Sequence, residues 1–468
     1  MTPYQELLAR KRVMFEPRGL KRVPGLSPAL REHQLHSTKF ALKAGCGALF
    51  LDTGLGKTLC ALEWGRVLVE KLNKPVLMLA PLAVGPQHRR EAEKFGIEAH
   101  YVREPQQITH PSIWITNYER LEKFAEFEWG GVILDESSIL KSFTGKTTRA
   151  LIETFAATPY RLACTATPAP NDHMELGQHS EFLGAMDSNE MLARWFISDQ
   201  KNMGRYRLKR PAVGPFWDWV ASWARCISLP SDIGLSDDGF VLPELLLKQQ
   251  VVRADTSIDA GEERKGGQLR MFRIPEMSAT SIHREKRLTV TARADAIAKT
   301  VASEPGEPWV IWCDTDYEAD ALAERIPEAV EVRGSMSAEK KEERLVGFTE
   351  GDVRILITKP SIAGYGLNWQ HCARQAFVGL SFSYESFYQA VRRSHRFGQL
   401  RSVHVHVAMA DTEKVIWDVI NRKSGDHESM KRQMRSAMAR AVAKHKVFED
   451  YRPTRRVKVP AWLEGAAS

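Results

Sequence analysis

The residues with the clearest chemical potential lie in a glycine-rich turn, residues 52–58, with the sequence DTGLGKT. Gly54 and Gly56 let backbone N–H groups point at a phosphate chain, and the amino end of a following helix adds partial positive charge. Lys57 supplies a cation for the terminal phosphates, and Thr58 a hydroxyl for Mg²⁺. We predict a nucleotide-binding loop formed by Thr53, Gly54, Leu55, Gly56, Lys57 and Thr58. The alternative, a chance glycine-rich turn, is disfavoured because strand-like sequence precedes the loop and helix-like sequence follows it.

Two carboxylates end a short apolar run at residues 132–136, VILDE. Such a run predicts a buried strand whose carboxyl end carries Asp135 and Glu136. A phosphate-binding loop alone positions neither the metal nor the attacking water, and this pair can do both. We predict that Thr58 and Asp135 hold Mg²⁺, and that Glu136 and Lys57 are catalytic.

Strand-length and helix-length patterns alternate around these motifs. In the first half, apolar runs that predict strands lie at residues 48–51, 76–80, 113–116, 132–134 and 161–164. In the second half, similar apolar runs predict strands at residues 309–313, 330–332, 353–357, 376–380 and 403–408. Strands that alternate with helices favour parallel sheets covered on both faces. We therefore expect an α/β protein with two tandem parallel-sheet domains.

The remaining segments suggest where the domains end. We assign 1–230 to the first domain, with an aromatic and basic helical segment at about 190–230, and 288–420 to the second. Residues 231–287 are polar and glycine-containing, which is typical of a linker or an insertion. The helical spacing of Phe216, Val220 and Trp223 favours a packed helix over a row of base-stacking rings.

Composition narrows the class of protein. The balance of 43% hydrophobic and 26% charged residues excludes disordered and fibrous classes, and no apolar run is long enough to cross a bilayer. Six separated cysteines without a C-x-x-C pair suggest free thiols in a reducing compartment. With no secretory signal recognised, we expect a cytoplasmic protein.

The formal net charge of +8 favours an anionic partner. Twelve basic and five acidic residues lie in 421–468, so this basic tail carries most of the excess. We expect a helix and a loose end along phosphates, with a solubilising tail as the alternative.

In order, the motifs resemble those of superfamily-two helicases and, more closely, the SNF-type DNA-dependent ATPases, whose domains are RecA-like. The resembling segments are 30–34 (LREHQ), 51–58, 134–138 (LDESS), 80–82 with 84–88, 116–119 (TNYE), 165–168 (TATP), 311–313, 357–368 (ITKPSIAGYGLN) and 389–399 (QAVRRSHRFGQ). The last is the most specific, because its paired arginines would stabilise charge on the γ-phosphate of ATP bound between the domains.

Residue roles follow from this resemblance. Gln34 would read adenine, Gly366 would contact ATP, and Arg393 and Arg396 would be catalytic arginine fingers. The residues implied to couple hydrolysis to movement are Ser138, Thr165, Thr167 and Gln389. Those implied to contact nucleic acid are Pro81, Asn117, Tyr118, Lys359 and Ser361.

The chain departs from the family pattern at several positions. Ser138 replaces the histidine of the usual DEAH sequence, TATP lacks the usual glycine, and Pro360 and Tyr365 alter residues 357–368. These changes fall mainly in the motifs implied to couple hydrolysis to movement, and the phosphate loop keeps the family pattern. The compact chain resembles bacteriophage or bacterial members of the family.

The resemblance implies a DNA-dependent ATPase that uses ATP and Mg²⁺ to move along DNA. Duplex translocation is favoured, and the alternatives are a strand-separating helicase or a nucleotide-gated DNA-binding adaptor with weak ATPase. A small-molecule kinase would not need the second domain. Duplex DNA is the favoured partner, ahead of single-stranded DNA and RNA, with replication or recombination proteins as further candidates and no membrane. A monomer would suffice, because one chain supplies both halves of the site.

Overall fold

A computed structural model of the chain describes residues 15–81, 84–170, 172–198, 206–254, 279–363 and 367–444. The first domain is built on seven parallel strands in the order β3-β4-β2-β5-β6-β1-β9. Their bounds are β1 Cys46–Leu51, β2 Val76–Ala80, β3 Ala99–Tyr101, β4 Ile113–Asn117, β5 Gly131–Asp135, β6 Tyr160–Cys164 and β9 Ala224–Ile227. The helices are α2 Glu32–Ala44, α3 Lys57–Leu72, α4 Gly85–Lys94, α5 Lys146–Thr154, α6 Leu176–Leu183, α7 Ser188–Trp195 and α8 Val213–Trp223.

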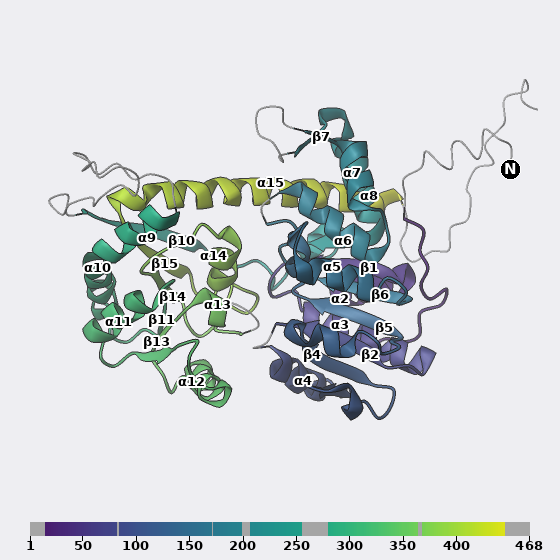
Figure 1. The fold of residues 1–468 in the computed structure, drawn as a ribbon, viewed down its shortest axis with the longest axis horizontal. Helices are drawn as coiled ribbons and strands as arrows, with labels where there is room; N and C mark the ends of the chain where they lie inside the picture. Colours follow the sequence, from purple (N-terminus) through teal and green to yellow (C-terminus); the bar gives the residue numbers. More distant parts are fainter. Residues whose placement is uncertain are drawn as a thin grey trace, which may run out of the picture.

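The second domain contains six parallel strands in the order β10-β15-β14-β11-β13-β12. Their bounds are β10 Leu245–Val252, β11 Trp309–Trp312, β12 Val330–Val332, β13 Ile355–Thr358, β14 Arg374–Phe377 and β15 Val403–Ala410. The helices are α9 Ala279–Leu288, α10 Val290–Ala302, α11 Asp316–Arg325, α12 Ala338–Glu350, α13 Pro360–Ala363, α14 Tyr384–Val391 and α15 Lys414–Lys444. The two sheets lie side by side, and α15 runs along both domains (Figure 1).

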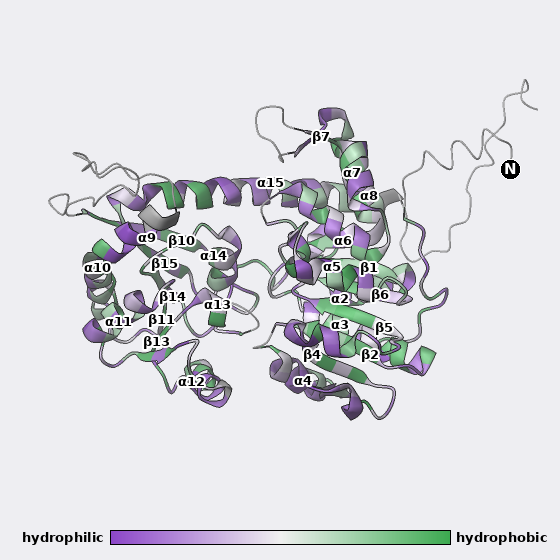
Figure 2. Cartoon of the chain, viewed as in Figure 1, coloured by the Kyte–Doolittle hydropathy of each residue, from purple (hydrophilic) through white to green (hydrophobic). Residues whose placement is uncertain are grey.

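The sheet strands are apolar because helices cover both faces of each sheet. Every residue of β1, β2, β4 and β5 is buried, as is every residue of β11 and β13. Continuous burial, rather than alternation, is expected of parallel sheets in α/β proteins. Figure 2 shows the hydrophobic colours concentrated in these inner strands. The predicted α/β fold with two parallel-sheet domains is confirmed.

Three strands of the two parallel sheets were absent from the sequence prediction: β3, β9 and β10. The first two are short, with three and four residues. The eight residues of β10 lie inside the expected linker 231–287 and pair along their whole length with β15. β10 is an edge strand in which no residue is fully buried, and its sequence, LLLKQQVV, has polar residues at its centre, unlike the inner strands. The predicted linker range therefore contains part of the second sheet.

The aromatic segment before the linker is mostly core. In α8, Phe216, Trp217, Trp219, Val220 and Trp223 are all buried. Next to this segment, β7 (Phe196–Ser198) and β8 (Tyr206–Leu208) form a small antiparallel hairpin. The packed-helix interpretation is thus the one that the structure adopts.

Residues 414–444 form one helix, α15, which includes the first part of the expected basic tail. Its early residues Ile416, Trp417 and Ile420 belong to the second domain's core. Its later residues Met430, Met434 and Met438 belong to the first domain's core. Basic side chains on its later turns bind acidic groups of the first domain, as in the ion pair of Arg440 with Asp218 at 2.7 Å. Residues 445–468 lie outside the described residues.

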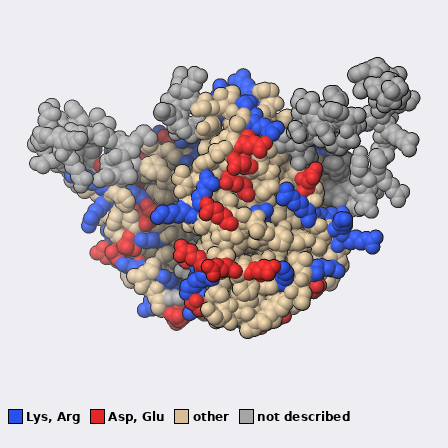
Figure 3. All heavy atoms as spheres, turned by 45° about the vertical axis from the view of Figure 1, so that its right-hand side comes forward, with Lys and Arg blue, Asp and Glu red and all other residues tan. Residues whose placement is uncertain are grey.

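All six cysteines are buried and unpaired, as the sequence suggested. Within the described ranges, the helices are too short or too polar to span a bilayer. On the face drawn in Figure 3, basic and acidic side chains are interspersed, so this face carries no patch of a single sign.

Candidate functional site

The strand order brings the predicted motifs to one place. β6 lies between β5 and β1 in the first sheet. The phosphate loop follows β1, Asp135 ends β5 and Thr165 follows β6. All three strands are parallel, so their carboxyl ends meet at one edge, where ligands of open α/β sheets bind.

The phosphate loop has a backbone that requires glycine. Gly54 and Gly56 have φ angles of 93° and 78°, in the left-handed region. The Gln34 amide donates a 3.1 Å hydrogen bond to the Leu55 carbonyl and packs against Gly56, leaving no room for a Cβ atom there. The predicted Gln34 and the loop are therefore in direct contact, while the adenine-reading role remains a prediction.

Lys57 is held at the centre of the loop by a 2.9 Å hydrogen bond from its ammonium group to the Leu51 carbonyl. Burial lowers its pKa, and the nearby carboxylates of Glu136, Asp52 and Asp135 oppose that shift. A desolvated cation attracts a phosphate chain strongly, and the nearby carboxylates compete with the phosphate for it. Thr53 and Thr58, both half-buried, flank the same loop.

Asp135 is buried at the end of β5 and forms a 2.7 Å ion pair with His88 of α4. Burial opposes protonation of His88, but Asp135 outweighs it and raises the His88 pKa. The carboxylate of Asp135 and the hydroxyl of Thr58 offer the oxygen donors that Mg²⁺ prefers, and the His88 contact shows that Asp135 attracts positive charge here. The donor set therefore fits a hydrated magnesium ion.

Glu136 adopts a left-handed backbone, with φ 52° and ψ 52°, which is unusual for a residue other than glycine. Such strain is often found where a functional side chain must be aimed. Burial raises the Glu136 pKa to about 7, with Asp135 adding to the shift and Lys57 and Arg393 opposing it. The Thr165 hydroxyl lies 3.5 Å from the Glu136 carboxylate, so two predicted residues from neighbouring strands meet.

The two predicted arginines are anchored together on the second domain. The Leu367 carbonyl accepts a 3.0 Å hydrogen bond from Arg393 and another of 3.0 Å from Arg396. Gln389, which is also buried, accepts a 3.1 Å bond from Arg393 through its side-chain oxygen. Gln389 therefore positions Arg393 directly. Gly366, expected to contact ATP, lies outside the described residues.

The charges of both arginines act on carboxylates of the first domain. Arg393 acts electrostatically on Glu136, and Arg396 acts on Glu91 of α4. Burial lowers the Arg396 pKa, with partial compensation from Glu91. Among the described residues, the Nε group of Arg396 has no hydrogen-bond partner. A buried guanidinium group with an unused donor is poised for an anion such as a phosphate.

The coupling residues are only partly brought together. The Thr165 hydroxyl accepts a 3.1 Å bond from the Thr167 backbone N–H, which links these two residues. Ser137, rather than the predicted Ser138, joins the end of β5 to α6, through a 3.2 Å contact with His179. Ser138 is buried next to it, and its coupling role stays a prediction.

The predicted nucleic-acid residues of the first domain differ in accessibility. Pro81 is half-buried at the end of β2, but Asn117 and Tyr118 are buried. The Tyr118 hydroxyl donates a 2.6 Å bond to the Asp135 carbonyl, and the Asn117 amide lies 3.4 Å from the Tyr101 hydroxyl. In this arrangement neither side chain is available to a nucleic acid, and Tyr118 instead supports the acidic motif. The apolar sequence around them could have indicated this burial, because Asn117 ends β4, a strand in which every residue is buried, and Tyr118 follows it directly.

Lys359 and Ser361 of the second domain line an open hollow of about 310 Å³. Its other lining residues are Asp316, Arg333, Gly334, Ser335 and Ile362. Lys359 forms a 2.8 Å ion pair with Asp316. Arg333 pairs with Asp320 and Glu331, so carboxylates balance both cations of the hollow, and the nucleic-acid contact of Lys359 and Ser361 stays a prediction.

Sequence reasoning missed an aromatic stack beside Gln34. Phe397 stacks on Phe240 with ring centroids 4.8 Å apart, and the Arg31 guanidinium lies 4.8 Å from the Phe397 centroid. Phe240 comes from the expected linker and Phe397 from the loop after the arginines. A single phenylalanine in a sequence does not indicate a site. Phe240 and Phe397 come into contact only through the packing of the two domains.

Two protein-family models match the chain, one in each domain. The SNF2-related domain matches residues 33–208, and the helicase conserved C-terminal domain matches residues 292–398. The first match covers every strand of the first sheet except β9, and the second covers every strand of the second sheet except β10 and β15.

Two curated proteins are similar to parts of the chain. ATP-dependent helicase brm of Drosophila melanogaster is 30% identical over 171 residues, covering 32% of this chain and 10% of that protein. DNA annealing helicase and endonuclease ZRANB3 of Homo sapiens is 24% identical over 427 residues, covering 82% of this chain and 39% of that protein. The chain thus spans less than half the length of either relative.

A solved structure, the Sulfolobus solfataricus SWI2/SNF2 ATPase core in complex with dsDNA, is 18% identical with a TM-score of 0.42. The match covers 89% of this chain and 98% of that one. With both domain models matched in order on the two sheets, the chain belongs to the SNF2-type proteins of helicase superfamily two.

Proposed function

We propose that the chain is a DNA-dependent ATPase that couples ATP hydrolysis to movement along DNA, with duplex translocation favoured. The observation that carries this proposal is the placement of Arg393 and Arg396. They are anchored on the second domain, yet they act on Glu136 and Glu91 of the first. A nucleotide on the phosphate loop would therefore contact both domains.

Each site residue has a role in the proposed reaction. Lys57 and the loop N–H groups bind the phosphates, and Glu136 accepts a proton from the attacking water. Thr58 and Asp135 hold Mg²⁺, which neutralises phosphate charge when bound. Arg393 and Arg396 stabilise charge on the γ-phosphate, so hydrolysis requires the domains to be closed. When the two domains open after hydrolysis, the DNA contacts of one domain would move relative to those of the other.

ATP turnover tests the proposal when it is measured without nucleic acid and with duplex DNA, single-stranded DNA or RNA. We expect the strongest stimulation with duplex DNA. Turnover that none of the three stimulates would contradict a nucleic-acid motor and favour the adaptor with weak ATPase.

Triplex displacement, measured beside unwinding of a forked duplex, then distinguishes translocation from strand separation. A translocase displaces the third strand and leaves the fork intact. Unwinding the fork would also require a protein element that inserts between the two strands. Efficient fork unwinding would assign the chain to the helicase alternative.

A further inference from the structure

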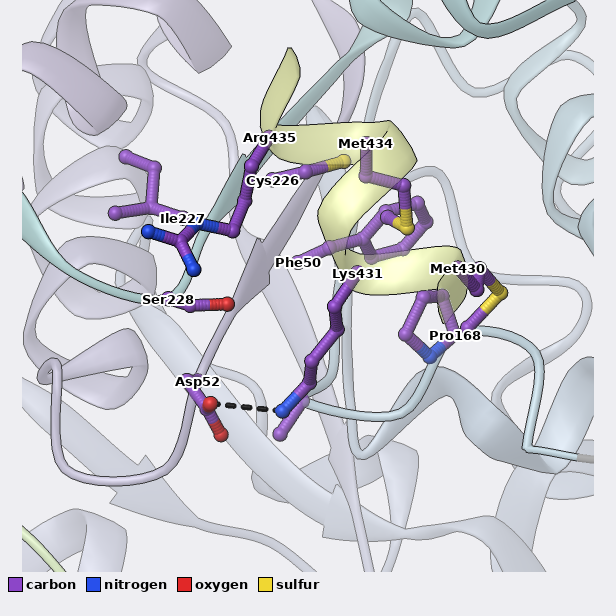
Figure 4. A pocket seen from close by; sticks show the side chains of 11 residues that line it. Phe50, Asp52, Pro168, Cys226, Ile227, Ser228, Met430, Lys431, Met434 and Arg435 are labelled. Atoms are coloured by element: carbon purple, nitrogen blue, oxygen red, sulfur yellow. Dashed lines mark hydrogen bonds and ion pairs between the residues drawn. The ribbon is translucent and has the colours of Figure 1, made fainter. Parts of the chain in front are cut away.

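Helix α15 connects the two domains and reaches the base of the phosphate loop. Its first turns are buried in the second domain's core and its later turns in the first domain's core. Met430, Met434 and Met438 repeat every four residues, so they form one apolar face against the first domain. Lys431, next to this face, points down toward Asp52 at the start of the loop (Figure 4).

Asp52 is the meeting point of three elements. Its carboxylate accepts a 2.8 Å bond from Lys431 of α15 and a 2.5 Å bond from the Tyr388 hydroxyl of α14. Arg392, which follows α14, lies 4.0 Å away. The side chains of Asp52 and Lys431 are only 12% and 11% exposed, so water screens their interaction weakly. Lys431 also donates a 2.9 Å bond to the Tyr388 hydroxyl.

The electrostatics show that Asp52 depends on these partners. Burial alone would raise the Asp52 pKa, but Lys431 and Arg392 outweigh burial and lower it below the ordinary value. Lys57 lies close to the same carboxylate: its ammonium group donates a 2.9 Å bond to the carbonyl of Leu51, the residue directly before Asp52, and Asp52 acts on it electrostatically. Two lysines thus share the attraction of one carboxylate, and Lys57 is the one that must be left for phosphate.

We propose that Lys431 is a positioning residue for the phosphate loop: it holds the Asp52 carboxylate so that Asp52 does not compete with ATP for Lys57. This inference rests on the proposed function, since it assigns Lys57 to the phosphates. The contact joins α15, the phosphate loop and the second domain, because Tyr388 belongs to the second sheet's domain. Through the Asp52 carboxylate, closure of the two domains is therefore linked to the availability of Lys57 for phosphate.

Lys431→Met tests the proposal. We expect the KM for ATP, and the equilibrium Kd for a fluorescent ATP analogue without DNA, to rise by about tenfold, the effect of losing one charge-assisted hydrogen bond. Lys431→Arg should keep the charge and most of the affinity. Arg440→Gln is the matched control, because it breaks an exposed ion pair between the same helix and the same domain. It should leave both constants unchanged.

The double variant Asp52→Asn/Lys431→Met separates positioning from simple docking of the helix. Without a carboxylate to compete for Lys57, its KM and Kd should return to within about threefold of the unmodified chain. If Lys431→Met leaves both constants unchanged, or if the double variant binds as poorly as Lys431→Met, the proposal is wrong. If the unmodified chain shows no DNA-stimulated turnover, the proposed motor function fails, while the binding comparison still decides the role of Lys431.

Discussion

A Cβ atom on Gly54 would lie 2.8 Å from the backbone nitrogen of Phe397, so the phosphate loop of one domain touches the arginine-bearing loop of the other. A carbon atom cannot approach a backbone nitrogen that closely without displacing it. The two loops on either side of the predicted nucleotide site therefore meet with no space for one methyl group.

Gly54→Ala should slow ATP hydrolysis by about 10²-fold, the cost of a displacement of about 1 Å in a catalytic arrangement. The new methyl group would push against Phe397, and the φ angle of 93° would be strained as well. Steady-state phosphate release measures the effect. Gly96→Ala is the control, because Gly96 has a φ of 66° but no atom near its Cβ position. Equal rates for the two variants would show that contact with Phe397 does not matter.

Glu136→Gln should retain ATP binding and lose DNA-stimulated phosphate release by about 10²–10⁴-fold, because the amide cannot accept the proton of the attacking water. Binding of a fluorescent ATP analogue and phosphate release would be measured on the same preparation. Glu153→Gln, on the exposed side of α5, should behave like the unmodified chain. Full turnover by Glu136→Gln would remove Glu136 from the catalytic role.

Arg396→Lys should lower kcat by about 10³-fold, because an ammonium group lacks the planar donor pair that stabilises the γ-phosphate. ATP affinity should change much less, since the arginine acts mainly in the transition state. Arg401→Lys is the control, because Arg401 binds Glu307 at an exposed site in the same domain. A loss of affinity with kcat unchanged would assign Arg396 to ground-state binding.

His179 should make the first domain sensitive to acid. Burial lowers its pKa to about 4, although contacts with the Glu175 carbonyl and Ser137 favour the protonated form. Between pH 6.5 and 4 the unfolded chain binds a proton at this position that the folded chain does not. Stability is therefore complete above pH 6.5 and falls as the pH drops toward 4.

Urea unfolding at pH 7 and pH 5 measures this dependence. We expect His179 to account for a loss of about 2 kcal/mol between the two pH values. His179→Gln should show a smaller difference between pH 7 and pH 5 than the unmodified chain. An identical pH dependence in both proteins would show that His179 titrates normally in the fold.

Lys359→Gln should weaken duplex DNA binding and reduce the slope of log affinity against log salt concentration by about 0.9, the value for one phosphate contact. Fluorescence anisotropy at several salt concentrations gives this slope. Lys74→Gln breaks a surface ion pair with Glu128 on the first domain and should leave the slope unchanged. An unchanged slope for Lys359→Gln would remove the hollow around Lys359 from the DNA contact.

Many local features could be predicted because they depend on short stretches of sequence. The apolar runs at 76–80 and 330–332 predicted β2 and β12 with the bounds found in the structure. β10 could not be predicted from its sequence pattern. It is stabilised by pairing with β15, whose residues lie 158 positions later in the chain.

Residue types and spacing alone predicted the phosphate loop and the acidic pair, because phosphate and metal chemistry require them, and the paired arginines followed from the resemblance to SNF-type ATPases. Packing between separate elements turns Tyr118 inward and brings Ser137 to His179 and Lys431 to Asp52. These contacts join residues from separate elements, so they depend on how helices and sheets pack. They cannot be predicted from local sequence, because this burial and electrostatic pairing arise only when the two domains and α15 pack together.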